Sequence, residues 1–312
     1  MTPPATIRTS AARWRMSAVL LALGLATAAG CGRPDGVVVY TVQDRVFAEP
    51  LLRQAEQATG VRVVAVYDNE ANKGAALAQR LRAEAREPRA DLWWSNEEMR
   101  TRQLVRAGAL EEQVWRFGLR RRVLVTRTGD TLPVPPGSLA ALTNASLRGQ
   151  VSIAYPLFGT TTAHLLVLRE RWGEPAWIAW CEALVANRPL LADGNSRVVR
   201  AVAAGQVRLG LTDSDDVRFA RREGVEVVAH ALPEAEDLVI PNTLAITRGA
   251  RHASEARRVA DWLSGPDVLR SLVEAGASEP VEGVLPGGNE NWNPLLEGFE
   301  PSVERLGSWF VR

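Results

Sequence analysis

Four acidic residues are the side chains of this sequence best suited to bind a metal ion. Asp44, Glu97, Asp215 and Asp216 supply carboxylate oxygens, which are the ligands that small, highly charged or alkaline-earth cations prefer. Carboxylates that converge without a cation repel one another, and this repulsion raises a pKa. The run Asp213–Asp216 has a second interpretation as a helix start, with the first aspartate or the serine as cap and acids in the first turn. Both interpretations stay open, because a capped helix start still presents its first turn to a ligand.

A second segment, formed by Gly159, Thr160, Thr161 and Thr162, has the opposite polarity. A glycine followed by hydroxyls at a helix N-terminus offers backbone N–H groups, hydroxyl donors and a favourable dipole to an anion. The alternative is plain capping of the helix by a threonine. Lys73 is the only lysine in the chain, and it would add a positive charge to such an anion unless it is a solvated residue that pairs with a nearby glutamate.

The sequence contains no recognisable catalytic motif. Its three histidines, His164, His230 and His252, fall in no nucleophile or metal spacing, and there is no Gly-x-Ser-x-Gly or His-Glu-x-x-His sequence. Cys181 lies in an apolar helical stretch among tryptophans, where a buried core thiol is expected rather than a reactive thiolate. We therefore expect a protein that is not an enzyme.

The N-terminus has the layout of an export signal. Basic residues precede an apolar run from Ala18 to Ala29 that is too short to span a membrane, and Gly30 and Cys31 follow. This junction resembles a bacterial lipoprotein cleavage site, which predicts a signal peptide over 1–30, a lipid on Cys31 and a location in the periplasm or at the cell surface. Ordinary secretion with an incidental cysteine is the alternative.

Composition describes an ordinary globular protein. Removal of the signal leaves about 280 residues, enough for one large domain or two lobes. Hydrophobic residues make up 46% and charged residues 23% of the chain, and the net charge is +1. No polybasic surface for nucleic acid is therefore expected.

Apolar strands alternate with amphipathic helices along the mature chain, which predicts an α/β fold with largely parallel sheets. Strands are expected at 37–40, 61–67, 91–94, 120–127, 151–154, 207–211 and 238–247. Helices are expected at 47–59, 75–86, 253–263 and 266–276 and from residues 161, 175 and 196. The tail from residue 287 carries Trp292 and Trp309, so we expect it to pack against the protein.

Several motifs in this order resemble the extracytoplasmic solute-binding proteins of ABC transporters, in the group of the bacterial ferric-ion-binding proteins. The motifs, spread over residues 36–285, are Val38–Asp44, Ala90–Trp94, Gly159–Thr162, Ala186–Asn187, Gly194–Ser196, Gly205–Val207 and Gly210–Asp213. The resemblance implies a type II periplasmic binding protein, with two α/β lobes joined by a hinge of two crossing strands. Lobe one would comprise 36–124 and 245–312, and lobe two 125–244.

The resemblance also implies a ligand site. The family's tyrosine pair is replaced by Asp215 and Asp216, and Asp44 stands in the place of its histidine. Glu97 lies in the neighbourhood of its carboxylate. The threonine segment resembles the family's anion contact, Asn195 and Ser196 resemble a second contact, and Tyr40 of the opening motif is included in this wall. The expected cargo is Fe3+ or another metal ion, with or without a synergistic anion.

The function implied is capture of this cargo for delivery to an ABC permease and its ATPase, by a monomer held to the membrane by lipid. A phosphorylated or carboxylated small molecule is the alternative ligand, and a sensor lipoprotein is the alternative class. Trp93 and Trp94 add the option of stacking on an organic ring or sugar, although one of them is expected in the core.

Overall fold

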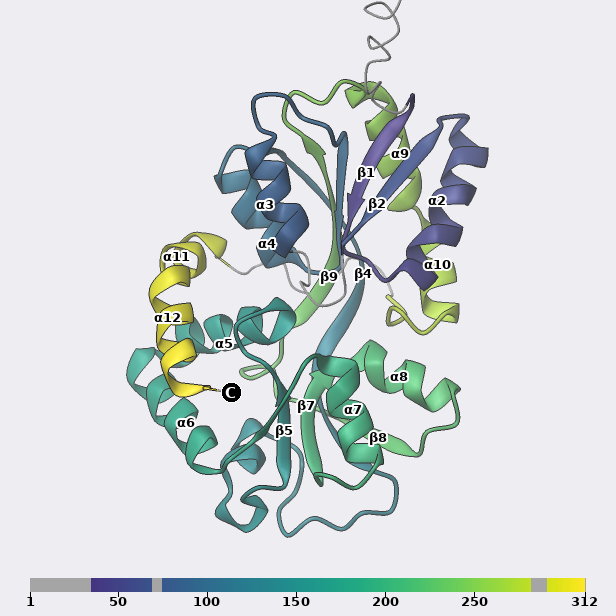
Figure 1. The fold of residues 1–312 in the computed structure, drawn as a ribbon. Helices are drawn as coiled ribbons and strands as arrows, with labels where there is room; N and C mark the ends of the chain where they lie inside the picture. The colour runs from purple at the N-terminus through teal and green to yellow at the C-terminus, as the bar shows by residue number, and fades with distance from the viewer. Residues whose placement is uncertain (1–34, 69–74, 282–290, 312) are drawn as a thin grey trace, which may run out of the picture. The chain divides into compact units, whose positions relative to one another are not determined.

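The computed structural model describes residues 35–68, 75–281 and 291–311 and has mixed α/β architecture (Figure 1). In its first part, β1 (Val37–Thr41) pairs in parallel with β2 (Val63–Tyr67) and with β3 (Leu92–Ser95). Every residue of β1 and β3 is buried, as expected for apolar parallel strands covered on both faces. The predicted strands at 37–40, 61–67 and 91–94 are therefore confirmed, with small shifts of their ends.

The strands form one hydrogen-bonded path in the order β2-β1-β3-β9-β4-β7-β5-β6, and β8 pairs with β4. Its remaining strands are β4 (Leu110–Arg127), β5 (Val151–Ala154), β6 (Leu190–Ala192), β7 (Leu209–Asp213), β8 (Val227–Ala231) and β9 (Val239–Thr247). Sequence analysis anticipated only the second half of the 18-residue β4. The missed half contains Glu111, Glu112 and Gln113, which interrupt the apolar alternation by which a strand is recognised.

The long strand β4 connects two groups of strands. Its residues up to Arg121 pair with β9, whereas its residues from Arg122 onward pair with β7 and β8 (Figure 1). We call β1, β2 and β3 the first strand group and β5, β6, β7 and β8 the second. The change of partner at Arg121 and Arg122 marks where the chain leaves one group for the other.

The helices largely follow the predicted amphipathic stretches. They are α2 (Arg45–Thr59), α3 (Ala75–Ala83), α4 (Glu98–Arg106), α5 (Gly159–Trp172), α6 (Glu174–Ala186), α7 (Asn195–Ala203), α8 (Ser214–Arg222), α9 (Ala253–Leu263) and α10 (Pro266–Glu274). In α3 the residues Leu77 and Leu81 lie four positions apart and are both buried. The helix ends at Ala83, three residues before the expected end at residue 86.

The C-terminal helices α11 (Trp292–Glu297) and α12 (Phe299–Trp309) pack against the second strand group's helices α5 and α6. Leu306 is buried there, and the rings of Trp309 and Trp177 lie 5.4 Å apart. The tail therefore packs against the protein, as predicted, and α11 also contacts α4. Helices α9 and α10 share the core of the first group, while α11 and α12 complete an apolar surface of the second.

No helix of the described ranges is long and apolar enough to cross a membrane. The predicted signal peptide and Cys31 lie outside the described residues.

Candidate functional site

Two buried arginines mark the centre of the candidate site. Arg120 and Arg122 lie two residues apart on β4, so their side chains project from the same face of the strand. Arg120 is 5% exposed and Arg122 is completely buried. They were not singled out from the sequence, although three consecutive arginines (120–122) at the start of a predicted strand were the available signal.

The pairing of β4 with β7 brings the acidic run to these arginines. Arg122 is directly opposite Asp213, the last residue of β7, and the backbone N–H of Arg121 donates to Ser214 Oγ at 3.1 Å. Helix α8 begins at Ser214, so Asp215 and Asp216 lie in its first turn. The predicted helix start is confirmed, but Asp213 occupies the N-cap position without making a side-chain cap hydrogen bond.

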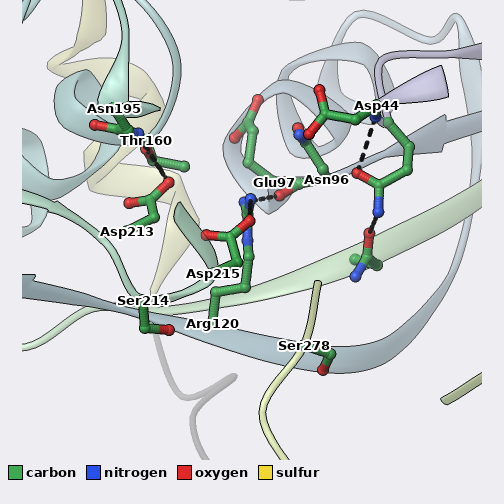
Figure 2. Close-up of polar contacts among 12 residues, drawn as sticks. Asp44, Asn96, Glu97, Arg120, Thr160, Asn195, Asp213, Ser214, Asp215 and Ser278 are labelled. Carbon is green, nitrogen blue, oxygen red and sulfur yellow. Dashed lines mark hydrogen bonds and ion pairs between the residues drawn. The ribbon is translucent and has the colours of Figure 1, made fainter. Parts of the chain in front are cut away.

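Asp213 instead forms a buried ion pair with Arg122. Its second oxygen, Oδ2, accepts hydrogen bonds from Thr160 Oγ1 at 2.8 Å and from Asn195 Nδ2 at 2.9 Å (Figure 2). Burial opposes ionisation of Asp213, but Arg122 and Arg120 outweigh this effect and lower its pKa. Asp213 is therefore ionised and fully engaged within the protein.

Asp215 contacts the other arginine. Arg120 Nη1 donates to Asp215 Oδ2 at 2.9 Å, and Arg120 Nη2 donates to the backbone carbonyl of Asn96 (Figure 2). Arg120 thus connects the end of β3 in the first strand group with the start of α8 in the second. The other oxygen, Asp215 Oδ1, is buried without a hydrogen-bond partner among the described residues.

Carboxylate oxygens of Asp213, Asp215 and Asp216 all lie within 4.8 Å of one another, a spacing that could hold a metal ion. Burial raises the pKa of Asp216 well above its usual range, and the charges of Asp215 and Asp213 raise it further. Burial also raises the pKa of Asp215, against the opposing effect of Arg120. The start of α8 is consequently a place where full ionisation of all three aspartates is disfavoured.

The other two predicted metal ligands lie just after strands of the first strand group, Asp44 after β1 and Glu97 after β3. Asp44 precedes α2 and is exposed, and its charge contributes to the raised pKa values of Asp215 and Asp216. Glu97 is 8% exposed, and its carboxylate accepts the backbone N–H of Arg100 at 3.0 Å as the cap of α4. Burial raises its pKa, although the charges of Arg100 and Arg120 act in the opposite direction. Figure 2 shows both acids near the Arg120 side of the site.

The predicted anion wall is at the expected helix starts, but the hydroxyls of Thr160 and Thr162 already donate within the protein. Thr160 donates to Asp213, Thr161 Oγ1 accepts from Arg122 at 3.4 Å, and Thr162 donates to the carbonyl of Pro156. The threonine-capping alternative is not supported, because α5 begins at Gly159 without a side-chain cap bond. At the start of α7, Asn195 joins the Asp213 cluster, whereas the neighbouring Ser196 is exposed.

Three further expectations have different outcomes. Tyr40 is completely buried and its hydroxyl donates to Glu84, which gives it a core role instead of a place on the wall. Trp93 and Trp94 are both completely buried, so the stacking option is wrong for both. Lys73 lies outside the described residues.

Comparison with known proteins assigns this sequence to a family. The family model described as bacterial extracellular solute-binding protein matches residues 38–277. No curated protein matches the sequence.

Solved structures share the fold at low sequence identity. Iron-bound HitA from Pseudomonas aeruginosa is 18% identical with a TM-score of 0.73, over 88% of this chain and 99% of HitA. The ferric binding protein from Campylobacter jejuni is 13% identical with a TM-score of 0.75, over 88% of this chain and 100% of that protein. The periplasmic binding protein AfuA from Actinobacillus pleuropneumoniae, with fructose-6-phosphate bound, is 17% identical with a TM-score of 0.67, over 78% of this chain and 83% of AfuA.

These similarities identify the architecture as that of the type II periplasmic binding proteins. The family match extends over most of the chain and includes β4, β7 and the start of α8, which carry the candidate site. This chain belongs to the bacterial extracellular solute-binding proteins.

Proposed function

We propose that this protein captures a metal cation through carboxylate oxygens and delivers it to the permease and ATPase of an ABC importer. The observation that carries the proposal is the pair Asp215 and Asp216 in the first turn of α8, where Asp215 has a buried oxygen without a hydrogen-bond partner among the described residues. Asp44 and Glu97 would complete the ligand set from the first strand group. The two groups, with α11 and α12 assigned to the second, would act as the lobes that close on the cargo.

Electrostatics favour a cationic cargo. Four carboxylates lie close enough to interact, because the charges of Asp44 and Asp213 raise the pKa values of Asp215 and Asp216, and Arg120 opposes this effect only in part. Burial and mutual repulsion raise the pKa of Asp216, and a bound cation would relieve that repulsion. Cation binding would thus compete with protonation of Asp216 and would release its proton.

Oxygen ligands suit a hard cation. Fe3+ is the first candidate, supported by the fold shared with iron-bound HitA. Because aspartates stand at the place of the family's tyrosine pair, iron here would be bound by carboxylates, and other hard cations would compete for the same ligands. Lipidation of Cys31 would keep the protein at the membrane beside its permease.

Elemental analysis combined with native mass spectrometry of protein purified without chelators tests the proposal directly. A stoichiometric metal is expected, together with stabilisation of the metal-free protein by the same ion in thermal melts. Asp215→Asn combined with Asp216→Asn should abolish that stabilisation, while Asp267→Asn, a change at an acid with 81% side-chain exposure, should leave it intact. Metal affinity unchanged in the double variant would refute the assignment of these ligands.

A phosphorylated small molecule is the second candidate, favoured by the shared fold of AfuA with fructose-6-phosphate. It would appear in the same mass spectra as an organic mass without metal. The engagement of Thr160 and Asn195 by Asp213 weighs against it, because those donors would have to be released first.

A further inference from the structure

The most enclosed polar cluster of the site converges on a single carboxylate. Asp213 is 2% exposed and accepts hydrogen bonds from Arg122, from Thr160 Oγ1 at 2.8 Å and from Asn195 Nδ2 at 2.9 Å. These donors come from β4, the start of α5 and the start of α7, which are distant in sequence. A guanidinium, a hydroxyl and an amide aimed at one point form the donor set with which proteins bind an anionic group. In this protein the anionic group is part of the chain.

We propose that Asp213 is a built-in counter-anion, which fills the anion-binding place formed by Arg122, Thr160 and Asn195. The protein would then take its cargo as a cation without an accompanying phosphate, carbonate or carboxylate. That the cation arrives without an anion rests on the proposed function. That Asp213 fills the anion-binding place does not depend on what the protein transports.

Tethering makes this arrangement difficult for an external anion to displace. A free anion loses translational and rotational freedom when it binds, whereas the Asp213 carboxylate is already held at the site by its backbone in β7. The completely buried Arg122 also contacts Asn195 Oδ1 at 3.1 Å and Thr160 Oγ1 at 3.3 Å, so the donors support one another around the carboxylate. Arg122 Nη1, Thr160 and Asn195 are therefore engaged before any ligand arrives, whereas Arg122 Nε has no hydrogen-bond partner among the described residues.

The neighbouring aspartates differ in a way that fits a division of roles. Asp215 keeps one buried oxygen without a hydrogen-bond partner among the described residues, and Asp216 lies half-buried next to it. Asp213, in contrast, uses both oxygens within the protein. The carboxylate of Asp213 would balance the charge of the arginines, and the carboxylates of Asp215 and Asp216 would remain available to bind the cation.

Chemical rescue tests the proposal without any metal. Asp213→Ala removes the carboxylate but keeps the Cβ, which leaves a space the size of formate beside the three donors. The variant should melt at a lower temperature than the wild type in sodium chloride. Sodium formate at equal ionic strength should restore part of the loss, with a rise of about 2–4 °C at roughly ten times its dissociation constant. Should Asp213→Ala fail to fold, Asp213→Ser replaces it.

Asp213→Asn is the matched control, because it lacks the charge but still fills the space. It should be destabilised and show no specific response to formate. The wild type should melt at the same temperature in formate, inorganic phosphate and chloride. Absence of rescue in the alanine and serine variants would overturn the proposal, and so would specific stabilisation of the wild type by phosphate. Because these melts contain no metal, a failure of the metal-transport proposal would leave their result unaffected.

Discussion

Replacement of Arg122 by methionine is the sharpest test of how the site is held together. Arg122 is completely buried, and its guanidinium is the partner of the buried Asp213 carboxylate. Methionine keeps much of the side-chain length but leaves Asp213 ionised without its main counter-charge. We therefore expect Arg122→Met to lower the free energy of unfolding strongly.

The magnitude follows from the geometry of the pair. At a charge separation of about 4 Å and an effective dielectric constant of about 20, the attraction between two unit charges is about 4 kcal/mol. The cost of removing both charges from water offsets much of this attraction in the intact pair, but loss of one partner leaves the other charge unpaired. Loss of a single partner typically costs about 3–5 kcal/mol, a large share of a total stability of about 5–15 kcal/mol.

Urea denaturation of the metal-free protein at pH 7 measures this loss. Arg270→Met is the control, because Arg270 and Asp267 form an exposed pair with 67% and 81% side-chain exposure, and its removal should change stability by less than about 1 kcal/mol. The double variant Arg122→Met with Asp213→Asn should be more stable than Arg122→Met alone, since no uncompensated charge remains. A loss below about 1 kcal/mol in Arg122→Met, or losses that simply add in the double variant, would refute the reasoning.

The pH dependence of the same variant gives an independent check. Because the pKa of Asp213 is lowered in the folded protein, its ion pair contributes stability above the ordinary aspartate pKa of about 4, and this contribution is lost as pH falls through the lowered value. The difference between wild type and Arg122→Met should therefore narrow in acid. A difference that stays constant from pH 7 down to the acid limit of folding would contradict the assignment.

Three further predictions concern the rest of the molecule. The raised pKa of Asp216 means that the native protein holds a proton that the unfolded chain has lost, so stability of the metal-free protein should fall as pH rises above about 4. Asp216→Asn should flatten this slope and stabilise the protein at pH 7 in urea titrations, and an unchanged slope would contradict the assignment. Leu306→Ala, at a completely buried position of α12, should cost about 2–5 kcal/mol in denaturant unfolding, whereas a loss below about 1 kcal/mol would mean that α12 is not stably packed. Gly118→Ala should lower the melting temperature more than Gly108→Ala. Both glycines have positive φ, but a Cβ added at Gly118 would meet Ser278 Oγ at 2.9 Å, whereas a Cβ added at Gly108 would meet no atom of the described residues within 4 Å. Equal losses in the two alanine variants would show that the contact with Ser278 is easily relieved.

Most secondary structure could be predicted because it follows from local patterns. The β-branched run of β1, the four-residue spacing of Leu77 and Leu81 in α3, and the Gly60 that ends α2 are visible in short windows of sequence. Cys181, expected as a buried thiol, is confirmed as such. Errors occurred where the pattern is interrupted, as in the polar first half of β4.

The candidate site was only partly predictable, because it depends on which strands become neighbours. The acidic run and the threonine segment were recognised as chemistry, but each has an alternative structural explanation when read alone. Their joint role emerges only when Arg120 and Arg122 are placed between them by the pairing of β4 with β7. Asp213 was considered only as one of two alternatives for a helix cap, with Ser214, because its partners Thr160 and Asn195 are 53 and 18 positions away in sequence.

The sequence by itself determined the α/β class, most strands and helices, and the residue types available for binding a cation or an anion, because these depend on local periodicity and side-chain chemistry. The tertiary structure alone decided that Tyr40, Trp93 and Trp94 belong to the core and that α11 and α12 pack on the second strand group. It also decided that Asp213 is ionised and paired with Arg122, whereas burial and the neighbouring aspartates raise the pKa of Asp216. The physical reason is that burial and charge pairing are sums over neighbours contributed by segments far apart in the chain, and those neighbours exist only once the strands have paired.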